Sequence, residues 1–390
     1  MLKNLYDYVD FKSINTSVKY LSISALFTGI GLGYFFTLIV ILAKYKNFSE
    51  STIGIISGSF SLGLMIAGFF VSKILDKIGL YKTMFVGISV QAVCVILAFI
   101  YFTPINLILN SFVMGCFGGI VWMTMDTWVN LVSNNDNRGK AIGFYNSAIT
   151  IGFALGPLII GIFGSKGQIP ILIAIALMVI RTPVIMIIKN QVENVKIPKL
   201  KKKLNFSYVK IAPFIFLSIL ISGIIDSSFG SLFPAFMINE FYSDKDIGNL
   251  FFVGLFFGVL SQPIVGALAD KINKRKIIIS LFIFHLIWPI LLNNFIFSIV
   301  IIYISIIFWG IASTSLYTVT LAYLGERINV AEISIAVSVF IIIFEFGEFI
   351  GPISVGIVMD IYGNNGFIYS AILFTVLSLL VGLLRSILKR

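Results

Sequence analysis

The sequence predicts an all-α integral membrane protein with twelve transmembrane helices. Of its 390 residues, 58% are hydrophobic and only 12% are charged, and the mean hydropathy is +1.04. Soluble globular proteins average ~45–50% apolar and ~25% charged residues. The composition therefore excludes a soluble enzyme, a disordered chain and a secreted disulfide scaffold. The apolar residues form continuous rather than alternating blocks, which indicates helices rather than barrel strands.

Twelve apolar blocks are long enough to span a bilayer, because a helix needs ~20 residues to cross ~30 Å of hydrocarbon. The expected spans are residues 19–44, 50–73, 82–102, 105–132, 139–164, 168–189, 211–240, 246–269, 276–292, 295–324, 331–360 and 366–386. Only the loop from Lys189 to Lys210 is long. We therefore expect an N-terminal six-helix half at 1–188, a basic cytoplasmic linker at 189–210 and a C-terminal six-helix half at 211–390.

The net charge of +11 is explained by topology rather than by a nucleic-acid partner. If the N-terminus is cytoplasmic, the inner segments hold 23 of the 28 Lys and Arg residues, and Arg181 lies within a span. The outer loops hold only Lys44, Lys46, Lys166 and Lys245. This bias follows the positive-inside rule. We expect both termini in the cytoplasm and the lipid bilayer, not nucleic acid, around the chain.

An internal repeat relates the two halves at an offset of 194–195 residues. Asp76-Lys77-Ile78 matches Asp270-Lys271-Ile272 in the equivalent loop. A Gly-xxx-Gly-Pro segment also recurs, with Gly152, Gly156 and Pro157 matching Gly347, Gly351 and Pro352. Two parallel six-span halves joined by a basic loop are a transporter architecture.

The repeated loop carries a family resemblance. Its second copy runs from Gly266 through Asp270-Lys271 to Lys276, and it resembles the loop pattern G-x-x-x-D-[RK]-x-G-[RK]-[RK] of major facilitator transporters. Each copy departs from the pattern at one glycine, with Ser72 in the first and Asn273 in the second. A carboxylate among basic groups at a helix end can form a latch that opens and closes as the halves rock. The expected latch residues are Asp76, Lys77, Lys82, Asp270, Lys271 and Arg275; the alternative is a plain helix-end carboxylate in water.

The Gly-xxx-Gly-Pro segment resembles the span-5 motif of proton-coupled antiporters in this superfamily. Small residues four apart also let helices pack closely, and repetition in span 11 favours that interpretation. Ser111 stands where drug antiporters usually carry an Arg, which disfavours drug antiport. The stretch from Gly115 through Asp126 to Lys140, and the tail of span 10 from Ser315 to Ala322, resemble the YcaD-like branch.

Three acids lie near the middle of predicted spans, where an ionisable group costs about 2.5–3.5 kcal/mol on insertion scales. Asp226 in span 7 is expected to bind a cationic group or carry a proton, or else to be a packing acid beside two serines. Glu345 and Glu348 in span 11 share one helix face. Two close carboxylates in a low dielectric resist double ionisation, which is typical of a proton carrier. The alternative is that one of them caps a backbone or pairs with a base.

Other intramembrane polar residues give weaker signals. Asp126 in span 4 is expected to line the cavity or pair with a basic residue. Arg181 in span 6 either snorkels to the interface or pairs with Asp126 or a substrate anion. His285 is expected to be peripheral and hydrogen-bonded rather than a proton relay. The side chains expected to add polarity or stacking surface to the cavity are Trp122, Trp128, Tyr145, Asn146, Trp309 and Tyr317.

The resemblance implies a secondary active transporter that moves a small organic solute across a bacterial cytoplasmic membrane. We expect proton coupling, a monomer, and neither enzymatic activity nor a cofactor or metal, since the sequence has no nucleophile triad, metal cluster or Walker pattern. Two alternatives stay open: an uncoupled facilitator or exchanger, in which the acids only organise packing, and a non-transporting membrane sensor.

Overall fold

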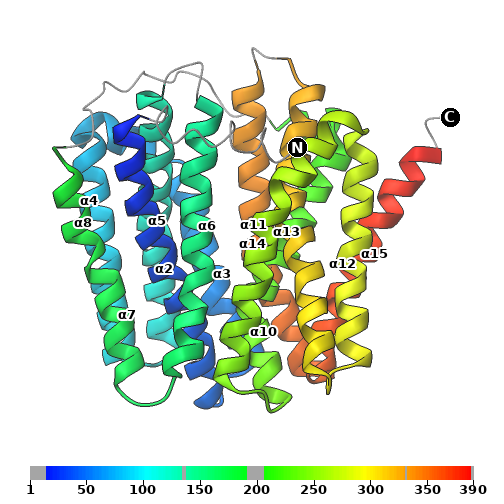
Figure 1. Cartoon of the computed structure of the whole chain (residues 1–390), viewed down its shortest axis with the longest axis horizontal. Helices are drawn as coiled ribbons and strands as arrows, with labels where there is room; N and C mark the ends of the chain where they lie inside the picture. The colour runs from blue at the N-terminus through cyan, green and yellow to red at the C-terminus, as the bar shows by residue number, and fades with distance from the viewer. Residues whose placement is uncertain (1–14, 134–137, 191–205, 330–331, 388–390) are drawn as a thin grey trace, which may run out of the picture. The chain divides into compact units, whose positions relative to one another are not determined.

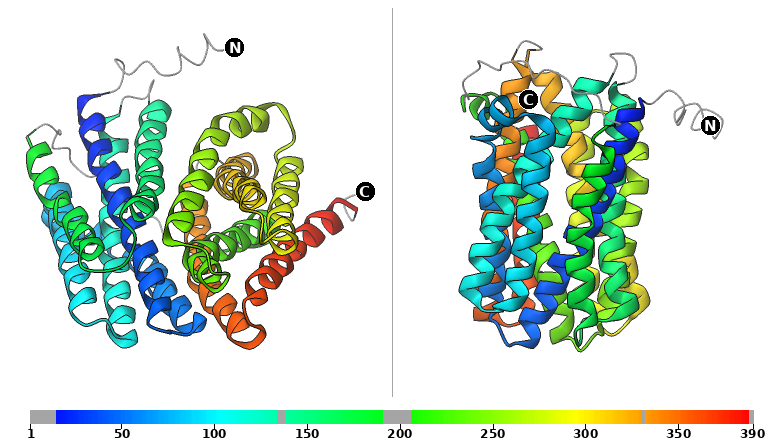
Figure 2. Two further views of the ribbon diagram at one scale, coloured as in Figure 1. Left: turned by 60° about the horizontal axis from the view of Figure 1, so that its bottom comes forward. Right: turned by 90° about the vertical axis from the view of Figure 1, so that its left-hand side faces the viewer.

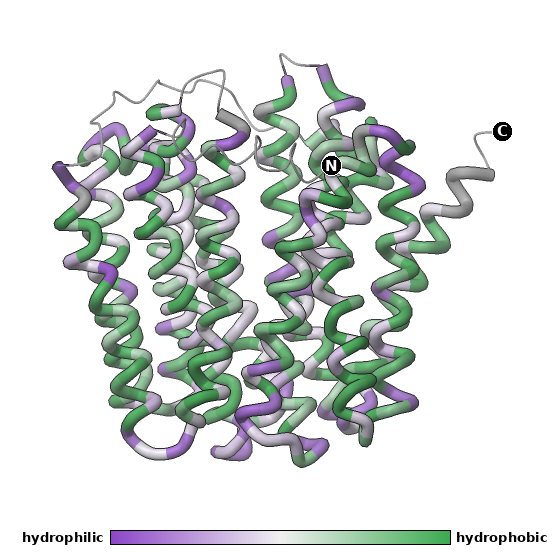
Figure 3. The backbone as a smooth tube through the Cα atoms, in the orientation of Figure 1, coloured by the Kyte–Doolittle hydropathy of each residue, from purple (hydrophilic) through white to green (hydrophobic). Residues whose placement is uncertain are grey.

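The computed structural model describes residues 15–133, 138–190, 206–329 and 332–387, without the side chains of residues 138, 139, 188, 270, 334 and 383–387. Within this part of the chain, twelve helices are long and apolar enough to cross a membrane, as predicted. They are α2 (Thr16–Tyr45), α3 (Glu50–Ala67), α4 (Val71–Ile100), α5 (Pro104–Val132), α6 (Arg138–Phe163), α7 (Ile169–Val179) continued by α8 (Arg181–Ile188), α10 (Pro213–Asn239), α11 (Asp244–Lys271), α12 (Lys274–Asn294), α13 (Ile299–Arg327), α14 (Ile333–Tyr362) and α15 (Asn365–Ile387) (Figure 1). A short helix, α9 (Tyr208–Ile211), precedes α10. Apolar residues cover most of each helix, and hydrophilic ones gather mainly near the ends (Figure 3).

The helix boundaries differ most from the sequence expectation between the second and third spans and within the sixth. The second span, expected to reach residue 73, ends at Ala67. The segment before the third span is helical from Val71, because α4 continues across a kink at Gly79, whose φ is +78°. This first segment is short and carries Lys73, Asp76 and Lys77 among its apolar residues, so it forms no apolar block. The sixth span is interrupted at Ile180, between α7 and α8. Pro183 explains this break, because it has no N–H to offer the carbonyl of Val179 one turn earlier.

The chain groups into two compact units that we describe separately. Unit 1 comprises Met1–Phe35, Gly63–Gly156 and Lys166–Leu200, and unit 2 comprises Phe36–Leu62, Pro157–Ser165 and Lys201–Arg390. Helices α2, α3 and α6 therefore contribute residues to both units. The division into six-helix halves at 188 and 211 is a division along the sequence, and it stays a prediction.

Unit 1 has an apolar core to which α2, α4, α5, α6 and α8 contribute. Its members include Leu21, Met84, Trp128, Tyr145 and Ile185, each at most 2% exposed. In unit 2, α10 packs along α14, while α11 and α12 both pack along α13 (Figures 1 and 2).

Glycines of the repeated motif lie where helix backbones touch. A Cβ on Gly152 of α6 would clash with the Leu26 carbonyl oxygen and lie 2.9 Å from the Gly29 Cα on α2. In unit 2, a Cβ on Gly351 of α14 would lie 2.5 Å from the Ile224 carbonyl oxygen on α10. Gly156 faces Tyr34, and Gly347 faces Leu220, in the same way. The motif thus brings α6 against α2 in unit 1 and α14 against α10 in unit 2.

Candidate functional site

Three carboxylates gather between α10 and α14 in unit 2. Asp226 lies on α10, and Glu345 and Glu348 lie on α14. The carboxyl groups of Glu345 and Glu348 lie close enough to interact with each other, and Glu348 also interacts electrostatically with Asp226. Gly223 allows this proximity, because a Cβ there would lie 3.1 Å from the Glu348 backbone nitrogen. We call Asp226, Glu345 and Glu348 the acid cluster.

Serine hydroxyls from three helices face the acid cluster. Ser222 of α10 donates to Asp226 Oδ2 at 3.1 Å. Ser61, in the part of α3 that belongs to unit 2, lies against the Glu348 carboxylate, and Ser313 of α13 lies against the Asp226 carboxylate. The sequence did not indicate Ser61 or Ser313, since serines are common in apolar spans and only the fold shows which ones meet the acids.

No described lysine, arginine or histidine nitrogen lies within 4.0 Å of the acid cluster. Glu345 is only 9% exposed, and its Oε2 has no hydrogen-bond partner; the same is true of the buried Oδ1 of Asp226. Carboxylates this close repel one another when all are ionised, and the buried Glu345 also lacks solvation by water. The arrangement can therefore hold exchangeable protons or accept a cationic group.

Unit 1 carries a separate polar group around Asp126 on α5. Its carboxylate lies beside the Tyr145 hydroxyl of α6 and the Trp122 indole. Trp122 in turn packs against Phe153, with 6.4 Å between ring centroids. The Asn130 amide donates to the Asp126 backbone carbonyl at 2.9 Å. Asp126 is thus held by aromatic neighbours of its own unit.

Arg181 does not form the expected pair with Asp126, and it does not snorkel. It is 1% exposed, and its Nη2 donates to Gln91 Oε1 at 2.8 Å while Nη1 lies 3.2 Å from Met178 Sδ. Its Nε has no partner. The reason is packing: α8 lies against α4, which presents the neutral Gln91, and Gly31 of α2 leaves room for the arginine side chain.

The other residues expected in the cavity are dispersed. Trp128 and Tyr145 are buried in the apolar core of unit 1, so Trp128 does not line a polar cavity. Asn146 is exposed. Tyr317 packs edge-on against Phe340 and Phe344 of α14, with ring centroids 5.4 and 5.1 Å apart.

The only histidine is fully buried in unit 2 rather than peripheral at the lipid. His285 Nδ1 accepts a hydrogen bond from Trp288 Nε1 at 3.3 Å, and Nε2 lies 3.4 Å from Ser313 Oγ. Ser305 donates to the Trp288 carbonyl at 2.7 Å. Trp288 follows His285 by three residues, and this helical spacing is the signal that could have indicated the pair.

The expected latch residues make few contacts among the described residues, and the latch stays a prediction. The exposed side chains of Asp76, Lys77, Lys82 and Lys271 make no hydrogen bond or ion pair there, and the side chain of Asp270 lies outside the described part. Arg275 donates to the Gly382 carbonyl at 2.6 Å and lies over the Phe214 ring.

An ion pair that the loop motif did not indicate lies at the start of α12. Lys274 Nζ lies 2.6 Å from Glu326 Oε1 at the end of α13. Glu326 ends the tenth span, and only the packing of α12 along α13 shows that it faces this loop.

The departure of the second loop copy from the glycine pattern has a structural reason. Gly79 has a φ of +78°, which favours glycine, whereas Asn273 has a φ of −53°. The Asn273 side chain instead accepts a hydrogen bond from the Arg275 backbone at 3.0 Å and caps α12. Ser72, which replaces the first glycine of the pattern in the first copy, has a similar explanation. At the equivalent Gly266, an added Cβ would meet nothing within 4 Å, so this position does not require glycine.

A second polar network joins helix ends within unit 2. The Asp360 carboxylate at the end of α14 accepts hydrogen bonds from the Glu50 and Ser51 backbone nitrogens at 2.9 and 3.1 Å. The Asp244 carboxylate at the start of α11 accepts from the Ser165 backbone and hydroxyl at 3.0 and 2.5 Å. We call these two contacts the clasp.

The clasp follows the internal repeat, since Glu50 aligns with Asp244 and Ser165 aligns with Asp360. Directly beside it, Gly54 of α3 touches the Pro352 carbonyl of α14, and the equivalent Gly248 of α11 touches the Pro157 carbonyl of α6. Thus, within unit 2, segments from the first half of the sequence contact segments from the second half twice, in equivalent ways.

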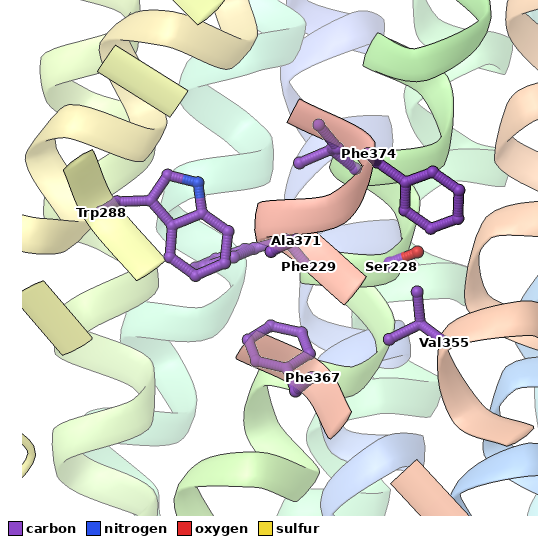
Figure 4. A pocket seen from close by; sticks show the side chains of 8 residues that line it. Ser228, Phe229, Trp288, Val355, Phe367, Ala371 and Phe374 are labelled. Atoms are coloured by element: carbon purple, nitrogen blue, oxygen red, sulfur yellow. The ribbon is translucent and has the colours of Figure 1, made fainter. Parts of the chain in front are cut away.

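An apolar crevice also lies in unit 2, and it differs from the acid cluster in chemistry. Its lining comes from α10, α12, α14 and α15: Ile225, Ser228, Phe229, Trp288, Val355, Phe367, Ala371 and Phe374 (Figure 4). The one hydroxyl, on Ser228, donates to the Ile224 carbonyl of its own helix. The crevice therefore offers packing surface but no charged group.

Comparisons with known proteins agree with this architecture. An uncharacterized MFS-type transporter of Methanocaldococcus jannaschii is 26% identical over 375 residues, covering 93% of this chain and 95% of the relative. The uncharacterized MFS-type transporter YcaD of Escherichia fergusonii is 21% identical over 334 residues, covering 84% and 85%. Among solved structures, a mutant of the nucleoside transporter NupG superposes with a TM-score of 0.77 at 14% identity, covering 95% and 98%.

The family model of the Major Facilitator Superfamily matches residues 21–214 and again residues 215–389. The resemblance expected from the loop motif and from the YcaD-like stretches is thereby confirmed. The chain is a multi-pass membrane transporter and not an enzyme, and it belongs to the Major Facilitator Superfamily.

Proposed function

We propose that this protein is a proton-coupled secondary active transporter that moves a small organic solute by alternating access. The observation that carries the proposal is the acid cluster, in which Asp226, Glu345 and Glu348 meet without a described counter-cation. A group of carboxylates that cannot all be ionised together binds and releases protons as its surroundings change. The membrane is the cytoplasmic membrane with both termini inside, since the Lys and Arg residues favour the inner loops.

The clasp supports alternating access. It joins α3 to α14 and α6 to α11 through a few hydrogen bonds and glycine contacts. Such contacts are strong enough to hold one end closed, yet few enough to break during a transport cycle, as rocking of two repeats requires.

The first step of the test identifies a solute. Purified protein is heated with amino acids, sugars, nucleosides, organic acids or lipophilic cations at pH 5.5 and 7.5, because a ligand that binds the native state raises the melting temperature. Uptake of the stabilising solute is then measured in proteoliposomes with and without a pH gradient. We expect the gradient to accelerate uptake.

The combined variant Glu345→Gln/Glu348→Gln tests whether the acid cluster does the coupling. We expect it to keep its fold and lose the dependence of flux on the gradient. Glu332→Gln is the matched control, because Glu332 precedes the same helix, α14, but is exposed and outside the acid cluster. Identical flux with and without the gradient in the unsubstituted protein would instead indicate a facilitator.

A further inference from the structure

A chain of polar side chains connects the buried histidine to the acid cluster. His285 lies on α12, Ser313 on α13 and Asp226 on α10. Ser313 Oγ lies 3.4 Å from His285 Nε2 and also faces the Asp226 carboxylate, whose buried Oδ1 has no hydrogen-bond partner. The hydroxyl of Ser313 thus faces both the imidazole and the acid.

Trp288 fixes the tautomer of His285. The Trp288 Nε1–H can only donate, and it points at His285 Nδ1 at 3.3 Å, so Nδ1 must accept. In the neutral imidazole the proton then lies on Nε2, which faces Ser313. Trp288 is held in turn by its own burial, at 1% exposed, and by T-shaped packing against Phe229.

We propose that His285 is a positioning residue for Asp226, acting through Ser313. The Nε2–H of His285 donates to Ser313 Oγ, which leaves the Ser313 hydroxyl proton free to be offered to Asp226. The structure assigns His285, Ser313 and Trp288 a shared role: they hold a donor against one carboxylate of the acid cluster. This inference rests on the proposed role of the acid cluster in proton coupling.

The contacts from His285 through Ser313 to Asp226 favour one protonation state of Asp226. When Asp226 is ionised, the Ser313 hydroxyl stabilises it; when Asp226 takes up a proton or a cation, that donor is no longer needed there. Among the described residues, the other titratable groups near Asp226 are Glu348 and, beyond it, Glu345, both on α14. His285 on α12 and Ser313 on α13 therefore stabilise the ionised form of Asp226. Glu345 and Glu348 on α14 destabilise it by charge repulsion.

The test uses the fact that the protein has one histidine. Protein labelled with ¹⁵N-histidine gives one imidazole signal pair, and we expect a protonated Nε2 and an unprotonated Nδ1. Asp226→Asn, which is nearly isosteric, is expected to shift the Nε2 resonance, and Ser313→Ala is expected to abolish the effect of Asp226→Asn. Glu332→Gln serves as the control that leaves the resonance unchanged.

A transport measurement gives the functional readout. Because the Ser313 hydroxyl favours ionised Asp226, His285→Leu is expected to move the pH midpoint of solute flux upward by about one unit, a tenfold change in proton affinity. His285→Gln retains an N–H donor and is expected to restore most of the midpoint. A purely structural histidine would lower the amount of folded protein in both variants without moving the midpoint.

Two results would overturn the inference: a protonated Nδ1, or a histidine spectrum that is identical with and without Asp226→Asn. These results are independent of transport. If the spectra show the connection but solute flux ignores the pH gradient, the proposed function fails while the positioning of Asp226 stands.

Discussion

The clasp allows the energetics of the proposed transport cycle to be tested at one residue, Asp360. Its two carboxylate oxygens accept hydrogen bonds from two backbone nitrogens at the start of α3, at 2.9 and 3.1 Å. Asp360→Asn removes the charge and leaves one acceptor oxygen in place of two. The closed clasp is therefore weakened while the side chain keeps its size.

The expected free-energy change follows from the charge of Asp360 and the hydrogen bonds that it accepts. A hydrogen bond to a charged group contributes about 1.5–3 kcal/mol when shielded from water, and a carboxylate at an exposed helix N-terminus adds about 0.3–1 kcal/mol. Asp360 is exposed, so we take the lower values and expect the closed clasp to be destabilised by about 1.5 kcal/mol. Since 1.4 kcal/mol is a factor of ten, the ratio of open to closed clasp rises about tenfold.

Distances between spin labels report this ratio. We place labels at Lys46→Cys and Tyr362→Cys, two exposed sites that flank the clasp, after replacing Cys94 and Cys116 with alanine. Double electron–electron resonance should show a larger population at long distance in Asp360→Asn.

The control for this experiment is Asp246→Asn. Asp246 also caps a helix N-terminus, but it bonds only within its own capping box with Ser243. The reasoning is refuted if the distance distribution of Asp360→Asn matches that of the unsubstituted protein, or if the control shifts it equally.

Two further predictions concern packing and burial in unit 1. Gly152→Ala forces a Cβ against the α2 backbone and should destabilise the protein by about 1–3 kcal/mol. Gly143→Ala is the control, because it lies on the same helix and its Cβ would meet nothing within 4 Å. Thermal unfolding compares the two variants, and equal melting temperatures would contradict the close α2–α6 contact. Gln91→Leu removes the side-chain oxygen that accepts from the buried Arg181 and should lower the free energy of unfolding by about 3–5 kcal/mol. The double variant Gln91→Leu/Arg181→Met should recover much of this stability. A double variant less stable than Gln91→Leu would show that the guanidinium has another partner.

Much of the fold was accessible from the sequence because membrane insertion imposes a simple rule. A helix that crosses hydrocarbon needs a long apolar block, so the twelve spans follow from composition along the chain. The segment from Val71 to Gly79 was missed for the same reason, since a short helix interrupted by Lys73, Asp76 and Lys77 forms no long apolar block.

The candidate site was only partly accessible. Mid-span acids stand out in an apolar sequence, and Asp226, Glu345 and Glu348 do meet in unit 2. The choice between partners did not follow from the sequence. Arg181 bonds Gln91 and not Asp126, and His285 faces Ser313, because helix packing decides which faces meet and the sequence shows only the order of the helices.

The measurement that tests the central claim most directly is proton movement driven by the solute. Proteoliposomes loaded with a pH-sensitive dye receive the solute identified by thermal stabilisation, at equal pH on both sides. We expect a change in internal pH that grows with solute flux in the unsubstituted protein and in Glu332→Gln, and that disappears in Glu345→Gln/Glu348→Gln although the variant still binds the solute. Solute flux without any change in internal pH, or an undiminished change in the variant, would contradict proton coupling through the acid cluster.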